Sequence, residues 1–201
     1  MTPVDIAKVC IGTALLAYAS IGDIRHRRVA DGIWILMAAA AIILLPMSTV
    51  RVEDIPPAAM VIGISVSLRF LRVFGGADCK ALIATVLLFP VRPDMPFLPV
   101  LPHGNYFPVT VLTNSLLIFL VFPAWFISRN ICRGDISFPR MIMGYRISPS
   151  RLKKPFFIPL EKTGGTATGP VWASPSIPFV AIVSIAFIVS LVLGDIMLLL
   201  T

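Results

Sequence analysis

Long runs of apolar residues constrain this chain more than any other feature of its sequence. A helix needs about 20 apolar residues, and at least about 17, to cross the hydrocarbon core of a bilayer. Runs of this order recur along the whole sequence, in which 57% of the 201 residues are hydrophobic and 13% are charged. A soluble domain has roughly 25% charged residues, so the sequence predicts an all-α polytopic membrane protein.

Six membrane spans are predicted. Five long ones fall at about residues 4–22, 29–47, 57–74, 107–128 and 176–200, and a short sixth falls at about 77–90. At a rise of about 1.5 Å per residue the short helix is roughly 20 Å long, less than the hydrocarbon thickness of about 30 Å. We therefore expect it to be tilted, to be sheltered by its neighbours, or to begin below the membrane surface.

Basic residues are distributed unevenly between the two sides that these six spans define. Fourteen Lys and Arg fall on one side and three on the other. Because cytoplasmic loops are enriched in Lys and Arg, this bias predicts that both termini lie outside and that the segment 129–174 is a small cytoplasmic cap. Without the short span, that basic segment would fall on the wrong side. The larger group is Arg25, Arg27, Arg28, Arg69, Arg72, Lys80, Arg129, Arg133, Arg140, Arg146, Arg151, Lys153, Lys154 and Lys162.

Other classes of function find little support in the sequence. The net charge of +7 comes without the aromatic-interleaved basic patch or binding-fold pattern of a nucleic-acid-binding protein. The three cysteines have no CxxC spacing, so neither a disulfide framework nor a zinc site is indicated. We expect no nucleic acid, metal or cofactor, and we expect membrane lipids as partners of the basic face. The oligomeric state is not predicted.

Two aspartates stand at the cytoplasmic ends of predicted spans. Asp23 follows the first span in SIGDIRHRRV, and Asp78 begins the short span in GGADCKAL. An ionisable residue at membrane depth usually faces a cavity or bundle interior and pairs with another group. Structural roles remain open at this stage, because Asp23 could pair with Arg27 four residues later and Asp78 could cap its own helix.

The predicted topology brings Asp23 and Asp78 to the same membrane face at a similar depth. Gly75 and Gly76 precede the second aspartate, and glycine permits unusual backbone dihedrals and close approach of helices. Two adjacent carboxylates do not ionise together readily, so one keeps its proton. Such a pair can activate water as a general base and protonate a leaving amine as a general acid, and peptide hydrolysis needs both steps.

These motifs resemble the type IV prepilin peptidase family of GxGD intramembrane aspartyl proteases, and most closely its archaeal preflagellin (archaellin) peptidase branch. MGYRI at 143–147 and VWASPSIPF at 171–179 are similar to the C-terminal region of that branch. The resemblance implies that Asp23 and Asp78 are catalytic. It also implies that Gly75, Gly76 and Ala77 support the second motif, with Ala77 where many members have glycine.

The resemblance further implies a single membrane-embedded peptidase domain over 1–201. Its substrates would be precursors of archaellin or type IV pilin-like proteins, which lose a short basic leader at the cytoplasmic membrane face. Arg27 and Lys80 lie near enough in sequence to tune the pKa values of the aspartate pair. Two alternatives stay open: a small ion- or proton-coupled transporter or channel subunit that uses membrane-boundary aspartates, and a non-catalytic scaffold for archaellum or pilus assembly.

Overall fold

The chain forms two compact units. One comprises Met1–Ile118 and Phe179–Thr201, and the other comprises Phe119–Pro178. The computed structural model describes residues 2–71, 74–93, 106–152, 155–160 and 169–199. Four of the basic residues counted above, Arg72, Lys153, Lys154 and Lys162, lie outside the described residues.

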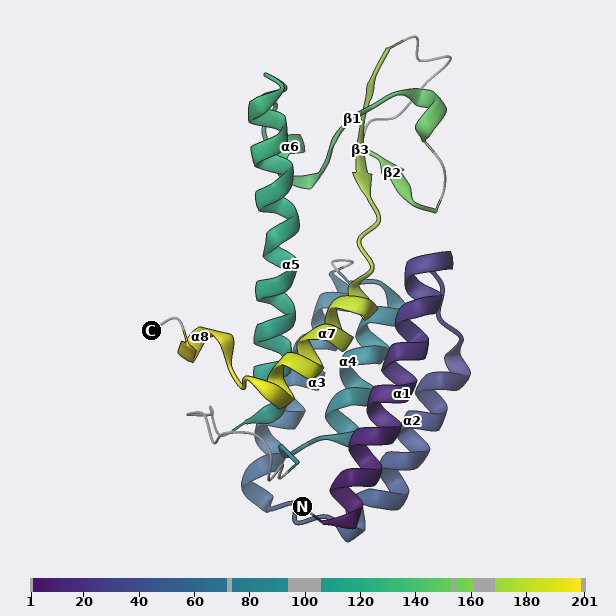
Figure 1. Cartoon of the computed structure of the whole chain (residues 1–201), viewed down its shortest axis with the longest axis vertical. Helices are drawn as coiled ribbons and strands as arrows, with labels where there is room; N and C mark the ends of the chain where they lie inside the picture. Colours follow the sequence, from purple (N-terminus) through teal and green to yellow (C-terminus); the bar gives the residue numbers. More distant parts are fainter. Residues whose placement is uncertain (1, 72–73, 94–105, 153–154, 161–168, 200–201) are drawn as a thin grey trace. The chain divides into compact units, whose positions relative to one another are not determined.

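The first unit is built from helices, several of which run side by side (Figure 1). Thr2 caps the first helix, because its hydroxyl accepts from the Asp5 N–H at 3.1 Å while the Asp5 carboxylate accepts from the Thr2 N–H at 3.2 Å. The helices are α1 (Pro3–His26), α2 (Asp31–Leu44), α3 (Ile55–Phe70), α4 (Gly76–Leu88), the first part of α5 (Phe107–Cys132), α7 (Phe179–Val192) and α8 (Ile196–Leu199), with the 3₁₀ turns η1 (Leu45–Met47) and η2 (Val52–Asp54) beside α2 and α3.

Helix α4 is the core helix of this unit. It packs against α1, α2, α3 and α7. Seven of its 13 residues are buried: Cys79, Ala81, Leu82, Ala84, Thr85, Val86 and Leu88. Burial on several sides agrees with the expectation that so short a helix is sheltered by its neighbours.

Helix α1 comes close to the C-terminal end of α4 at Gly12. A Cβ atom added to Gly12 would lie 2.6 Å from Cε2 of Phe89, a ring that is 1% exposed. That ring also packs on Phe187 of α7, with 4.8 Å between the centroids. The missing side chain at Gly12 therefore lets α1 approach the aromatic contact between α4 and α7.

Helices occur at the positions of most predicted spans, with one clear difference at the C-terminal end. Two of them, α1 and α5, are long and apolar enough to cross a membrane. The predicted span 176–200 is wrong as a continuous helix, because α7 ends at Val192 and α8 is separate. Gly194 has φ 76°, which ends helical geometry, and the Asp195 carboxylate accepts from the Met197 N–H at 2.9 Å to start the next turn. Residue 200 is outside the described range.

The second unit contains a small antiparallel sheet, which corrects the expectation of an all-helical chain. Strands β1 (Tyr145–Ile147), β2 (Phe157–Pro159) and β3 (Val171–Pro175) pair in the order β1-β3-β2 around Ile147, Val171 and Ala173. The end of α5, α6 (Arg140–Met143) and η3 (Pro149–Arg151) complete the unit. The buried Asn130 amide donates to the Met141 and Gly144 carbonyls at 3.0 and 2.7 Å, which fixes the chain where it enters β1.

Candidate active site

Asp23 lies in the last turn of α1 and is held by the start of α7. Its side chain is 8% exposed, and its Oδ2 accepts a hydrogen bond of 3.0 Å from the N–H of Val180, the second residue of α7. First-turn N–H groups have no partner within their own helix, and they favour negative charge. One turn earlier, the hydroxyls of Ser20 and Ser184 hydrogen bond at 2.7 Å and tie α1 to α7.

Asp78 is the third residue of α4, and its carboxylate turns back toward the residue before the helix. Its Oδ2 accepts from the Gly75 N–H at 2.8 Å. A carboxylate at this position commonly bonds to the backbone at the N-cap. The capping role that the sequence left open for Asp78 is therefore present, and the side chain is only partly buried.

Gly75 is required for space and not for an unusual backbone conformation. Its dihedrals, φ −67° and ψ 163°, are ordinary extended values, which corrects the dihedral part of the sequence argument. A Cβ at Gly75 would lie 2.8 Å from the Asp78 Oδ2 atom, whereas a Cβ at Gly76 would lie 3.8 Å from the nearest atoms of Arg69. Ala77, partly buried in the first turn, follows them.

The first turn of α7 contacts both Asp23 and the segment that leads into Asp78. Phe74, immediately before Gly75, packs its ring on that of Phe179 with 4.4 Å between centroids, and Phe179 immediately precedes the residue that bonds Asp23. The charge of Asp23 acts on Asp78, so the carboxylates lie within electrostatic range of each other. This arrangement brings near each other two carboxylates that are 55 positions apart in the sequence, and paired carboxylates are groups that can exchange protons as acid and base.

Of the two basic residues predicted to tune the aspartate pair, Arg27 lies beside Asp23 and Lys80 bonds a different carboxylate. Arg27, in the left-handed conformation at φ 55°, donates its N–H to the Asp23 carbonyl at 3.0 Å, and its charge acts on the Asp23 carboxylate. Lys80 instead bonds Asp31 of α2, with Nζ 2.7 Å from Oδ1. Arg69, which the sequence reasoning counted only among the basic residues of one side, packs alongside Gly76.

The sequence reasoning also missed Phe179 and Val180. Both come more than 90 residues after Asp78. Phe179 ends the VWASPSIPF stretch noted above, but neither residue was given a role at the site; the apolar helix that begins just after Pro178 was a further signal, because its first N–H groups have no partner within the helix. Across the described ranges, no three His, Cys, Asp or Glu side chains form a cluster suited to a metal ion.

Comparison with known proteins identifies the family to which this arrangement belongs. The model of the type IV leader peptidase family matches residues 10–128, more than half of the chain, and that stretch contains both aspartates. The chain belongs to this family. It is therefore a peptidase of the aspartic type, and the family resemblance seen in the two motifs is confirmed. The transporter and scaffold alternatives are set aside.

Related proteins match over almost the whole chain. The preflagellin peptidase of Methanococcus voltae is 26% identical over 219 residues, covering 92% of this chain and 94% of the relative. The preflagellin peptidase of Methanocaldococcus jannaschii is 24% identical over 223 residues, covering 92% and 93%. No solved structure matches the chain significantly. The match to these relatives thus extends beyond the family region and into the part of the chain that supplies α7.

Proposed function

We propose that this peptidase removes the short basic leader from precursors of archaellin or type IV pilin-like proteins, at the cytoplasmic face of the cell membrane. The proposal is supported by membership of the type IV leader peptidase family and by relatives named preflagellin peptidases. The observation that carries it is that the first turn of α7 contacts both Asp23 and Phe74, which leads into the Asp78 segment, with Asp23 and Asp78 in electrostatic range of each other.

In this proposal Asp23 and Asp78 hydrolyse the peptide bond as a pair. The ionised carboxylate takes a proton from a water molecule, whose oxygen attacks the scissile carbonyl, and the protonated carboxyl gives its proton to the departing amine. The products are a new carboxylate and a new amine, and the pair returns to one shared proton. Because coupled carboxylates titrate together, the acid and base roles are assigned to the pair.

Neighbouring residues are proposed to hold this pair in position. The N–H groups of Val180 and Gly75 bond Oδ2 of Asp23 and Oδ2 of Asp78 respectively, and these bonds are proposed to orient the two carboxylates toward water and substrate. Gly75 leaves the space that the Asp78 carboxylate occupies, and Gly76 and Ala77 form the first turn of α4. Arg27 is proposed to tune the pair because its charge acts on Asp23, while Lys80 is proposed to act less directly because it is already bonded to Asp31.

The membrane topology is part of the same proposal. Six spans, both termini outside and the segment 129–174 in the cytoplasm follow from the charge bias of fourteen basic residues against three. A single peptidase domain would then present Asp23 and Asp78 to the side on which a basic leader is synthesised. The basic segments of that side would contact the lipid headgroups of the membrane.

Co-expression with a preflagellin precursor tests the proposal. Asp23→Asn and Asp78→Asn should each lower leader removal by at least about 100-fold, since proton transfer by a positioned group contributes roughly 10²–10⁴ to rate. Glu53→Gln is the control, because it also removes one carboxylate charge but at an exposed residue, which pairs only with exposed Arg51 in the described structure. Leader removal is followed from the mass of the product, and membrane fractions are checked for equal amounts of each variant. Cleavage by Asp78→Asn at the wild-type rate would refute the assignment.

A further inference from the structure

The second unit has a pocket that the peptidase chemistry does not use. Its volume is about 590 Å³, within the range of about 300–1,000 Å³ that is usual for ligand sites. Its walls are formed by the C-terminal end of α5 with Arg133, by β1 and η3 with Ser148 between them, and by Phe157 of β2. Its polar side chains include Arg129, Arg133, Arg146, Arg151, Ser148 and Ser150.

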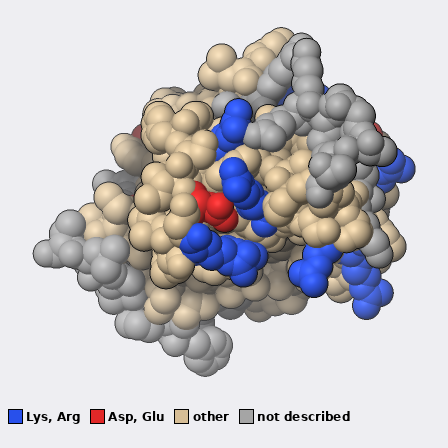
Figure 2. Space-filling view, turned by 90° about the horizontal axis from the view of Figure 1, so that it is seen from above, with Lys and Arg blue, Asp and Glu red and all other residues tan. Residues whose placement is uncertain are grey.

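Positive charge in this pocket is largely unopposed. Among the described residues of the second unit the only acidic one is Asp135, and its Oδ1 lies 3.4 Å from Nη1 of Arg146. The other three pocket arginines, Arg129, Arg133 and Arg151, therefore have no carboxylate partner within the described part of that unit. In Figure 2, which draws the whole chain, more Lys and Arg than Asp and Glu side chains are visible.

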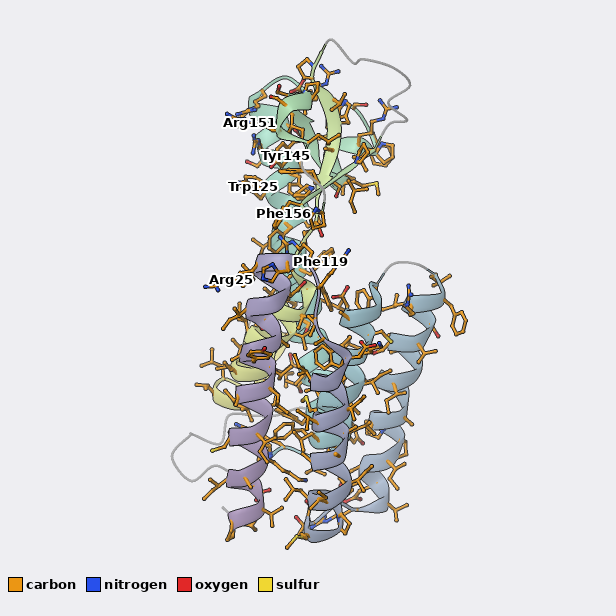
Figure 3. The ribbon with its side chains drawn as sticks, turned by 90° about the vertical axis from the view of Figure 1, so that its right-hand side faces the viewer. Arg25, Phe119, Trp125, Tyr145, Arg151 and Phe156 are labelled. Atoms are coloured by element: carbon orange, nitrogen blue, oxygen red, sulfur yellow. The ribbon has the colours of Figure 1, made fainter. Side chains whose placement is uncertain are left out.

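Arg129 is held in place before any ligand arrives. Its Cζ lies 3.8 Å from the ring centroid of Tyr145 and 5.2 Å from that of Trp125, two side chains that lie near each other in Figure 3. Such cation–π contacts orient a guanidinium group. The Arg129 Nε atom is buried without a hydrogen-bond partner in the described structure. An arginine fixed in this way loses little conformational entropy when it binds an anion.

We propose that this pocket binds the phosphate group of an anionic ligand. Guanidinium groups match phosphate oxygens with two parallel hydrogen bonds, and the Ser148 and Ser150 hydroxyls, 2.9 Å apart, can donate to further oxygens. The pocket is larger than one phosphate, and the Phe157 side chain lines it, so it also accommodates carbon attached to the phosphate. A phospholipid headgroup and a free phosphate compound share this chemistry.

Binding to the full-length protein in neutral detergent tests this inference. The probes are dioctanoyl phosphatidylglycerol, phosphate-free dioctanoylglycerol with the same chains, and inorganic phosphate, each titrated by microscale thermophoresis. Arg133→Gln and Arg151→Gln remove exposed charges and should each weaken phosphatidylglycerol binding about tenfold. Arg140→Gln is the matched control, because Arg140 is an exposed arginine of the same unit that does not line the pocket.

The outcomes separate the two sources of phosphate. Competition by inorganic phosphate would support a site open to soluble phosphate compounds, and saturable binding of phosphatidylglycerol without competition would support a site for lipid headgroups. The inference is overturned if neither phosphate probe binds saturably, if dioctanoylglycerol binds as tightly, or if Arg140→Gln weakens binding as much as the pocket variants. The assay measures binding alone, so its result is independent of the proposed peptidase chemistry.

Discussion

Replacing Gly75 with alanine should impair catalysis without preventing folding. The new Cβ would lie 2.8 Å from Asp78 Oδ2, and that oxygen must move by about 0.6 Å to reach an ordinary contact of 3.4 Å. The atom in conflict is the end of a side chain, so the carboxylate can move while the backbone stays. Its hydrogen bond to the Gly75 N–H, now 2.8 Å, is lengthened or lost.

The size of the effect follows from this displacement. A misplacement of about 1 Å in a catalytic group can lower the rate about 100-fold, so a shift of about 0.6 Å should lower kcat by roughly 10- to 100-fold. The loss of one cap interaction destabilises by only about 0.5–2 kcal/mol. Gly76→Ala is the matched control, since its Cβ would lie 3.8 Å from the nearest Arg69 atoms and needs no movement.

The assay is cleavage of a purified precursor by detergent-solubilised enzyme, with kcat and KM determined separately and thermal unfolding measured for each variant. Gly75→Ala should lower kcat with a near-normal unfolding temperature, and Gly76→Ala should behave as the wild type. A wild-type kcat for Gly75→Ala, or an equal loss in both variants, would show that the space beside Asp78 does not control catalysis.

Three further predictions concern the scaffold, each measured as the free energy of unfolding in mixed micelles. Gly12→Val should destabilise the protein by about 1–3 kcal/mol, because the new side chain overpacks against the buried Phe89 ring. Gly63→Ala is the control and should be neutral or stabilising, because no atom lies within 4 Å of its Cβ. Equal effects of the two changes would contradict the close approach of α1 to Phe89. Asn114→Ala removes three hydrogen bonds to α7, α8 and the turn between them and should cost about 2–4 kcal/mol. Ser115→Ala, which loses only a bond within its own helix, should cost less than about 1 kcal/mol, and a similar cost for both would contradict the interhelical role. Lys80→Gln should change stability by less than about 1 kcal/mol because its ion pair is exposed, and a larger loss would mean that the pair is more shielded than the structure indicates.

Hydropathy predicted the positions of most helices, because long apolar runs are typical of buried or membrane-spanning helices. The same signal failed at 176–200, where the residues stay apolar while Gly194, with its positive φ, interrupts the helix. It also failed at the sheet of the second unit, whose strands have three to five residues and include Pro159 and Pro175. Strands this short give too few residues for alternation to be recognised.

At the candidate site, the predicted helix topology placed Asp23 and Asp78 on one membrane face, and their catalytic pairing stays a prediction. Sequence reasoning could not find the hydrogen bond from Val180 to Asp23, since that depends on how the start of a distant helix packs. It assigned Gly75 a conformational role, whereas the need for space beside Asp78 becomes visible only when the carboxylate is placed. Long-range packing and side-chain direction were the missing information.

The bond between Asp23 and Val180 also bears on when the enzyme becomes complete during synthesis. The two residues are 157 positions apart, and α7 is the last long helix of the chain. At about 5–20 residues per second of translation, the ribosome makes Val180 roughly 8–30 s after Asp23. During that interval the aspartates can be in the membrane while Asp23 has no α7 donor. Under the proposed mechanism, a nascent or prematurely terminated chain that lacks α7 also lacks the donor that holds Asp23, so proteolysis is expected only from the finished chain.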